Sequence, residues 1–116
     1  MLLINDKFCL FSLGLQVSSQ SFGFIDVQNE GAYVARFFVT YSVNGVDVSR
    51  SSGDILIQHS KVILTPVGAQ NLRVTIQYMT FPGVYVNLMD HKLLSSSKCY
   101  ILTGSVFAPR FNQVTC

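Results

Sequence analysis

Asp90 and His91 are the residues whose types best suit catalysis, because a carboxylate beside an imidazole can orient that imidazole as a general base. The two are adjacent in the sequence, and Lys92 follows them. Adjacent side chains on an extended chain point to opposite sides, so a direct hydrogen bond within this pair is not expected. A solvated loop between strands accounts for all three residues, and His59, beside Ser60, is expected in a hairpin turn. A small hydrolase would rest on Asp90 and His91 alone, and we therefore predict that the chain is not an enzyme.

The cysteines suit a disulfide better than a metal. Cys9, Cys99 and Cys116 do not have the spacing of a zinc site, and both histidines are remote from any cysteine pair, so neither a metal nor a cofactor is expected. If Cys9 belongs to a cleaved leader, Cys99 and Cys116 remain as an even pair. A bridge between them would contribute roughly 3 kcal/mol in the chain-entropy model. Such a pair fits a secreted protein.

Composition indicates one folded domain and excludes some partners. The chain has 116 residues, of which 49% are hydrophobic and only 12% are charged, so it must bury a core. The formal net charge is +2, and the basic residues are scattered singly along the chain. No nucleic-acid partner is therefore predicted.

Residues 1–20 are expected to be a signal peptide or an N-terminal extension, and residues 21–116 a single β-sandwich domain. Residues 8–15 are mostly apolar and residues 17–19 could form a small-residue cleavage site, although Asp6 lies where a signal peptide is normally basic. A strand or short helix of the domain, or part of a longer parent chain, is the alternative. The signal interpretation predicts a secreted protein.

Alternation of apolar and polar residues predicts strands and no convincing helix. Residues 33–43 put tyrosine, alanine, phenylalanine and valine on one face, and Asn44-Gly45 is typical of a type I′ hairpin turn. Further strands are expected at residues 46–49, 55–58, 61–65, 72–78, 84–88 and 99–107. Short strands at this spacing predict an all-β fold, an antiparallel two-sheet β-sandwich that is immunoglobulin-like. A small closed barrel is the alternative.

Two predicted turns are unusually apolar. The first, at Pro82-Gly83, is flanked by large apolar and aromatic side chains, and the second is the apolar end of the last predicted strand at Val106-Phe107. Turn tips of a sandwich face water, so such residues either fold back onto the core or form a contact surface.

Three segments carry a resemblance to a known family. Residues 31–37, which open with Gly-Ala-Tyr-Val-Ala, residues 64–74 and residues 104–109 resemble the C-terminal membrane-binding β-sandwich of the thiol-activated, cholesterol-dependent cytolysins. The similarity runs from Gly31 to Pro109, with one compact region missing after the first strand. It implies a sandwich whose end loops touch a sterol-rich membrane.

The departures from that family fall on its binding loops. Residues 78–88 occupy the place of the family's tryptophan-rich loop, with only Thr80 matching, and this chain has no tryptophan. Met79 stands at the family's reactive cysteine, and Val106 and Phe107 stand at the Thr-Leu pair credited with sterol recognition. The family's three tryptophans and closing arginine correspond to Val84, Val86, Asn87 and Leu88. The 30 residues before Gly31 are too few to supply the family's pore-forming segments.

We therefore predict a non-catalytic module that contacts a membrane surface or membrane receptor, possessing no pore-forming segments and with sterol as one candidate ligand. The alternative is a protein- or glycan-recognition sandwich without lipid affinity. The predicted contact residues are those of the two apolar turns, namely Thr80, Phe81, Pro82, Val84, Tyr85, Val86, Val106 and Phe107.

Overall fold

A computed structural model describes residues 23–93 and 97–116. The interpretation of residues 1–20 as a signal peptide therefore lies outside the described residues. Within these described residues, all the regular secondary structure is β-strand. This part of the chain contains no helix that is long and apolar enough to cross a membrane. The strands are β1 (Gly23–Asn29), β2 (Ala35–Val43), β3 (Val46–Ser51), β4 (His59–Thr65), β5 (Gln70–Phe81), β6 (Val84–Lys92), β7 (Ser97–Ser105) and β8 (Ala108–Val114).

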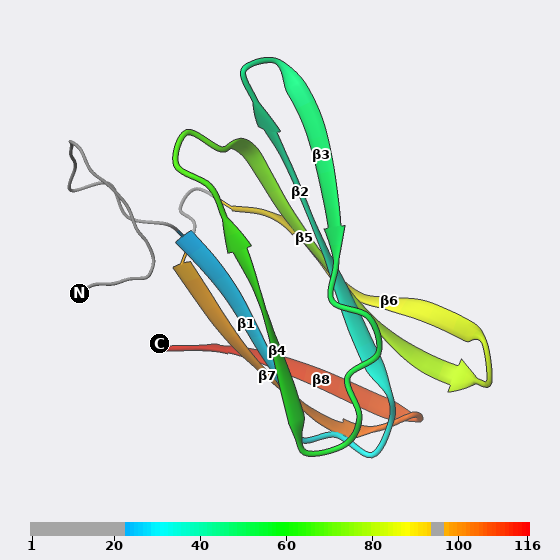
Figure 1. Ribbon diagram of the computed structural model, residues 1–116. Helices are drawn as coiled ribbons and strands as arrows, with labels where there is room; N and C mark the ends of the chain where they lie inside the picture. The colour runs from blue at the N-terminus through cyan, green and yellow to red at the C-terminus, as the bar shows by residue number, and fades with distance from the viewer. Residues whose placement is uncertain (1–22, 94–96) are drawn as a thin grey trace, which may run out of the picture.

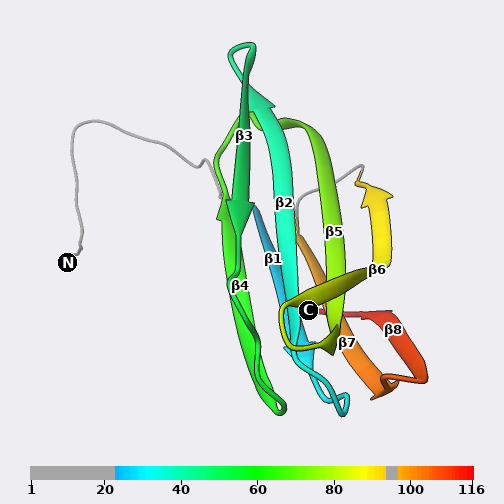
Figure 2. The same cartoon turned by 90° about the vertical axis from the view of Figure 1, so that its right-hand side faces the viewer.

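The strands form two four-stranded sheets, in the orders β4-β1-β7-β8 and β3-β2-β5-β6 (Figures 1 and 2). This confirms the predicted all-β, two-sheet sandwich. One pairing departs from the antiparallel expectation, because β1 and β7 run parallel at the centre of their sheet. Alternation along a strand reports which face is buried and carries no information about the direction of its neighbour.

The core lies between the sheets and follows the predicted parity. Tyr33, Ala35, Phe37, Val39 and Tyr41 are all buried, as expected for one face of a long strand. The partner strand β5 contributes the even positions of its first half, and β1 and β7 supply the opposite layer. The buried side chains of these three strands are Leu72, Val74 and Ile76 on β5, Ile25 and Val27 on β1, and Tyr100 and Leu102 on β7.

The predicted strand at residues 55–58 is wrong. Only Ile55 pairs, through an isolated bridge to Ala35, and the chain then turns. Gln58 has a positive φ of 64°, which an extended strand does not accommodate. The segment between β3 and β4 is consequently a connection in which Leu56 and Ile57 are exposed.

Two strands escaped the sequence prediction. β1 contains Asp26 and Gln28 on its outward side, and its apolar positions are too few to stand out from the preceding residues. β8 contains Pro109 and lies beyond residue 107, where the last predicted strand ends. Proline is tolerated here because β8 is an edge strand, where a missing backbone donor need not interrupt a ladder.

A buried polar corner joins β1 to β2, and we call Asn29, Gly31 and Tyr33 the Asn29 corner. Asn29 Nδ2 donates to the carbonyls of Tyr33 at 2.7 Å and Ile55 at 3.0 Å, and its Oδ1 accepts from the Gly31 amide at 3.0 Å. The Tyr33 hydroxyl donates to the Thr103 carbonyl at 2.7 Å, and burial raises its pKa. A Cβ on Gly31 would lie 2.5 Å from the Tyr33 ring. The distinctive Gly-Ala-Tyr motif thus has a structural role, because its packing and hydrogen bonds connect β1, β2 and β7.

The Cys99–Cys116 disulfide is present, with its Cα atoms 5.4 Å apart. It joins β7 to the residues that follow β8, beyond the Cys99 and Val114 pair of the ladder. The predicted pairing is confirmed.

Candidate functional site

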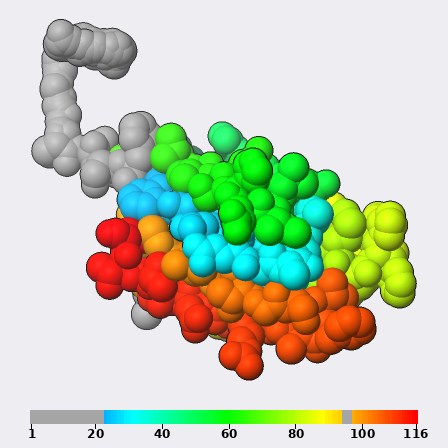
Figure 3. All heavy atoms as spheres, turned by 90° about the horizontal axis from the view of Figure 1, so that it is seen from below, coloured from blue at the N-terminus to red at the C-terminus, as the bar shows by residue number. Residues whose placement is uncertain are grey.

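Four connections meet at the lower end of the sandwich as drawn in Figure 1. They are the β1–β2 loop, the β3–β4 connection, the β5–β6 turn and the β7–β8 turn. Backbone hydrogen bonds join their roots, from Ala32 N to Gly104 O at 2.9 Å, from Met79 N to Val34 O at 2.8 Å and from Gln58 N to Asn29 O at 2.7 Å. Viewed from below, the green, cyan and orange segments lie side by side and the yellow-green hairpin projects beyond them (Figure 3).

The β5–β6 hairpin carries the first apolar tip. Its turn at Pro82-Gly83 needs a positive φ, and Gly83 supplies it at 79°. Phe81 and Val84 pair across the turn. Phe81 is 70% exposed, and Val84 is also exposed, as is Val86 two residues further along β6. The tip therefore presents apolar side chains to solvent instead of folding them onto the core.

The other predicted residues of this hairpin have different surroundings. Pro82 is exposed within the turn, whereas Thr80 is half-buried and its hydroxyl lies 3.5 Å from the Val84 carbonyl oxygen. Tyr85 is half-buried and turns away from the tip. Its hydroxyl donates to Asp54 Oδ1 at 2.5 Å, and its ring lies 3.4 Å below the guanidinium carbon of Arg36.

The β7–β8 turn carries the second apolar tip, formed by one residue. Phe107 is 97% exposed, while Val106 is half-buried and packs against the core. The two residues that stand at the family's Thr-Leu pair therefore differ in exposure, because Val106 packs against the core and Phe107 faces solvent.

A third apolar element was missed by the sequence analysis. Leu56 and Ile57 are 55% and 50% exposed in the β3–β4 connection at the same end. The available signal is the run of three apolar residues beginning at Ile55, a pattern that predicts a strand. The positive φ at Gln58 turns the chain so that only Ile55 of the three is buried.

We call the exposed apolar side chains of these connections the apolar end surface. Its members come from the β3–β4 connection, the two strands of the β5–β6 hairpin and the β7–β8 turn. They are Leu56, Ile57, Phe81, Val84, Val86 and Phe107.

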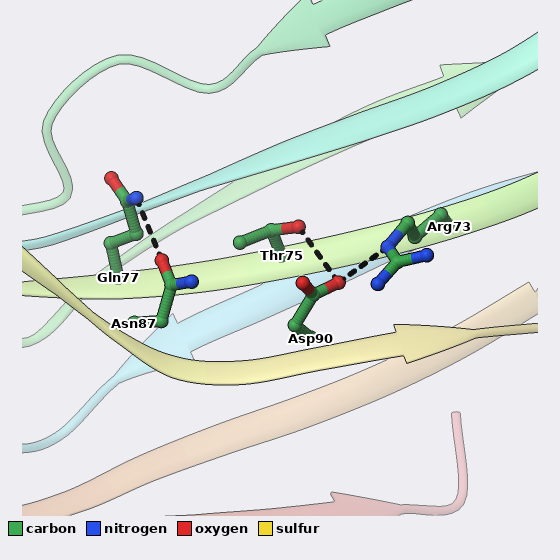
Figure 4. Close-up of polar contacts among 5 residues, drawn as sticks. All are labelled: Arg73, Thr75, Gln77, Asn87 and Asp90. Atoms are coloured by element: carbon green, nitrogen blue, oxygen red, sulfur yellow. Dashed lines mark hydrogen bonds and ion pairs between the residues drawn. The ribbon is translucent and has the colours of Figure 1, made fainter.

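The residues considered for catalysis do not form a catalytic pair. Asp90 Oδ1 accepts hydrogen bonds from Arg73 Nε at 2.6 Å and from Thr75 Oγ1 at 3.2 Å (Figure 4). Arg73 lowers the pKa of the Asp90 carboxyl. His91 instead places its ring 5.9 Å from the Phe111 ring, nearly edge-on. The adjacent side chains separate as predicted.

The expected loop positions of the histidines are wrong. Asp90, His91 and Lys92 are the last residues of strand β6, and His59 is the first residue of β4. Both places follow from pairing, because His91 lies opposite Val74 and His59 opposite Asn29. Within residues 23–93 and 97–116, no group of three or more His, Cys, Asp or Glu residues could hold a metal ion.

The paired sheets and gathered end loops define an immunoglobulin-like β-sandwich that resembles the membrane-binding domain of the cholesterol-dependent cytolysins. The solved membrane-binding domain of pneumolysin superposes with a TM-score of 0.63 at 18% identity, over 83% of this chain and 98% of that one. Suilysin from Streptococcus suis gives 0.61 at 22% identity over 82% of this chain, and listeriolysin O gives 0.62 at 18% over 83%.

These structures confirm the resemblance at the level of the fold. The chain spans only 23% of the length of suilysin and of listeriolysin O. No family model matches the sequence, and a search of curated proteins returns no match.

Proposed function

We propose that this chain is a non-catalytic membrane-binding module that contacts a membrane surface through the apolar end surface. The observation that carries the proposal is the exposure of Phe81 and Phe107, at 70% and 97%, on connections of the same end. Exposed apolar patches mark protein or membrane interaction sites when several large side chains gather on one face, as the members of the apolar end surface do at this end. The likeness of the fold to the membrane-binding domain of pneumolysin supports the same conclusion.

The energetics favour reversible binding. Fully burying one large apolar side chain contributes about 1.5–3 kcal/mol, and the partly exposed valines contribute less. Arg110 pairs with Thr103 near the β7–β8 turn and would add about 1 kcal/mol beside an anionic surface. Lys92 lies at the far end of β6 and has no part in this contact.

The proposal does not include pore formation, and it treats sterol as one membrane component among several. Val106 and Phe107 replace the family's Thr-Leu pair, so sterol dependence is a matter for the experiment. The disulfide supports an extracellular location, where such bonds persist.

Co-sedimentation with phosphatidylcholine vesicles, prepared with and without cholesterol and with and without phosphatidylserine, tests the proposal. The Phe81→Ser, Phe107→Ser double variant is expected to weaken binding at least tenfold, because two large apolar anchors are removed. Val46→Ser is the matched control, since Val46 is 64% exposed but begins β3 after the turn at the opposite end. Absence of binding to every composition would contradict the proposal, as would equal loss in the control.

A second candidate is a protein- or glycan-recognition module. The observation that favours it is the outer face of the β3-β2-β5-β6 sheet, where Gln77 Nε2 donates to Asn87 Oδ1 at 2.8 Å beside Tyr85 and Arg36 (Figure 4 shows the amide pair). Binding to immobilised glycans that is lost in Asn87→Ala and kept in the double variant would favour this candidate.

A further inference from the structure

Tyr85 reaches across the sheet in a way that the strand order does not require. It lies on β6, whereas Arg36 lies on β2, and β5 separates these strands. Neighbouring strands are about 4.8 Å apart, so the contact spans about 10 Å of sheet. The Tyr85 hydroxyl also donates to Asp54, which belongs to the β3–β4 connection. One side chain of the hairpin thus contacts two elements that are not its ladder partners.

The Arg36 guanidinium is also held in place by contacts that do not involve Tyr85. Its Nε donates to Gln77 Oε1 at 2.8 Å, and Gln77 in turn donates to Asn87. The guanidinium carbon also lies 5.1 Å from the centre of the Phe38 ring. A cation fixed by a hydrogen bond and flanked by two rings is a rigid support, because the hydrogen bond and both rings restrict its movement.

The β5–β6 hairpin needs such a support. Its pairing is irregular twice, between Ile76 and Gln77 and between Met79 and Phe81. Such irregularities bend a ribbon and increase its twist, and a two-stranded ribbon is only marginally stable by itself. Beyond Met79, whose amide donates to Val34, the hairpin projects past the rest of the molecule (Figure 3). Its direction is consequently not determined by its own ladder.

We propose that Arg36, Tyr85 and Asp54 form a latch that fixes the direction of the β5–β6 hairpin. Tyr85 is then a positioning residue that holds Phe81 outward, and it does not itself enter the membrane. The last step rests on the proposed function. The Asp54 hydrogen bond also raises the pKa of Tyr85, so the phenol remains a donor throughout the neutral range.

Hydrogen exchange of the hairpin amides tests the latch without any membrane. Arg36→Ala is expected to speed the amide exchange of residues 80–86 about tenfold, because the hairpin opens more often once the Arg36 contacts are lost. Tyr85→Phe keeps the ring on Arg36 and loses only the bond to Asp54, so a smaller increase is expected.

Arg73→Ala is the matched control, since Arg73 lies on the outer face of the same sheet but pairs with Asp90, away from the hairpin tip. It should leave exchange at residues 80–86 unchanged. Unchanged exchange in Arg36→Ala, or an equal rise in the control, would overturn the latch.

Single tryptophans separate positioning from insertion, because the chain contains none. With vesicles that bind the wild type, emission of Phe81→Trp is expected to shift to the blue, while emission of Tyr85→Trp stays unchanged. A shift at position 85 equal to that at position 81 would overturn the positioning role. If the wild type binds no vesicle, the proposed function fails while the exchange experiment still decides the latch.

Discussion

The Asn29 corner and the β5–β6 hairpin lie at the same end of the sandwich and have opposite character. In the corner, Asn29 is fully buried and its side chain makes three hydrogen bonds to backbone groups. In the hairpin, Phe81 and Val84 face solvent. The corner contains the motif that carries the cytolysin resemblance, and the hairpin contains most of the departures from it. The resemblance therefore describes the scaffold, whereas the side chains of the hairpin differ from those of the family.

Replacing Asn29 is expected to have the largest effect, because it destabilises the Asn29 corner and leaves the hairpin tip unaltered. Asn29→Leu leaves the Gly31 amide and the Tyr33 carbonyl without the partner that Asn29 supplies, and each buried unsatisfied group costs about 1–3 kcal/mol. The Ile55 carbonyl loses one hydrogen bond but still accepts from the Ala35 amide. The free energy of unfolding should fall by about 4 kcal/mol in urea titrations. Asn112→Leu, on exposed β8, should change it by less than about 0.5 kcal/mol. Equal effects of the two variants would show that the Asn29 corner contributes no more to the free energy of unfolding than an exposed position does.

Removing the disulfide affects neither member of the comparison directly. Cys99→Ser is expected to lower the free energy of unfolding by about 3 kcal/mol, because the bridge closes a loop with a sequence separation of 17 residues. Hydrogen exchange at the Asn29 corner and at the hairpin should rise only to the extent that global unfolding does. A larger local rise at residues 80–86 would mean that the disulfide supports the hairpin.

Leu56 sharpens the comparison, because it lies between the two regions. Leu56→Ser removes an exposed side chain, so stability should change by less than about 0.5 kcal/mol. Vesicle binding should weaken about fivefold to tenfold, since roughly half of the side chain is still available for burial. Ile55→Ser should instead unfold the domain partly, because Ile55 is fully buried. Unaltered vesicle binding in Leu56→Ser would remove the β3–β4 connection from the apolar end surface.

The smallest effect concerns pH and the Asp90 carboxyl. Because Arg73 lowers the pKa of the Asp90 carboxyl below its ordinary value, the ionised carboxylate adds stability above that ordinary value, and this stability is lost as the pH falls through the lower pKa of the folded state. The difference in urea midpoint between the wild type and Asp90→Asn should shrink towards zero between pH 5 and pH 2. Hairpin exchange should not follow this titration. If it does, the Arg73 pair communicates with the tip.

The sequence predicted the strands whose inward face is continuous. β2 and β5 alternate over many residues, and the Asn44-Gly45 turn has the expected positive φ at both residues. β1 was not predicted because its apolar positions are too few to stand out from the preceding residues. Residues 55–58 were wrongly predicted as a strand because an apolar run reports hydrophobicity and leaves the backbone conformation open. The direction of β7 relative to β1 depends on the whole topology, which no local pattern contains.

The candidate site was predictable to a similar degree. Phe81 and Phe107 follow from apolar residues placed at turns, and the structure exposes both. The surroundings of Tyr85 could not be predicted, since its partners Arg36 and Asp54 are 49 and 31 positions away and lie on elements that do not pair with β6. Contacts between non-neighbouring strands leave no periodic signal in a sequence.

The Asn29 corner also holds the bases of the end connections independently of the side chains at their tips. Asn29 and Tyr33 hold the β1–β2 loop, the β3–β4 connection and β7 by bonds to backbone groups, and none of these bonds involves a tip side chain. The tips can therefore change residue by residue while the base keeps its shape. In evolution this permits a new ligand without a new fold, and in the laboratory it makes the Phe107 turn a site for grafting short peptides of chosen specificity.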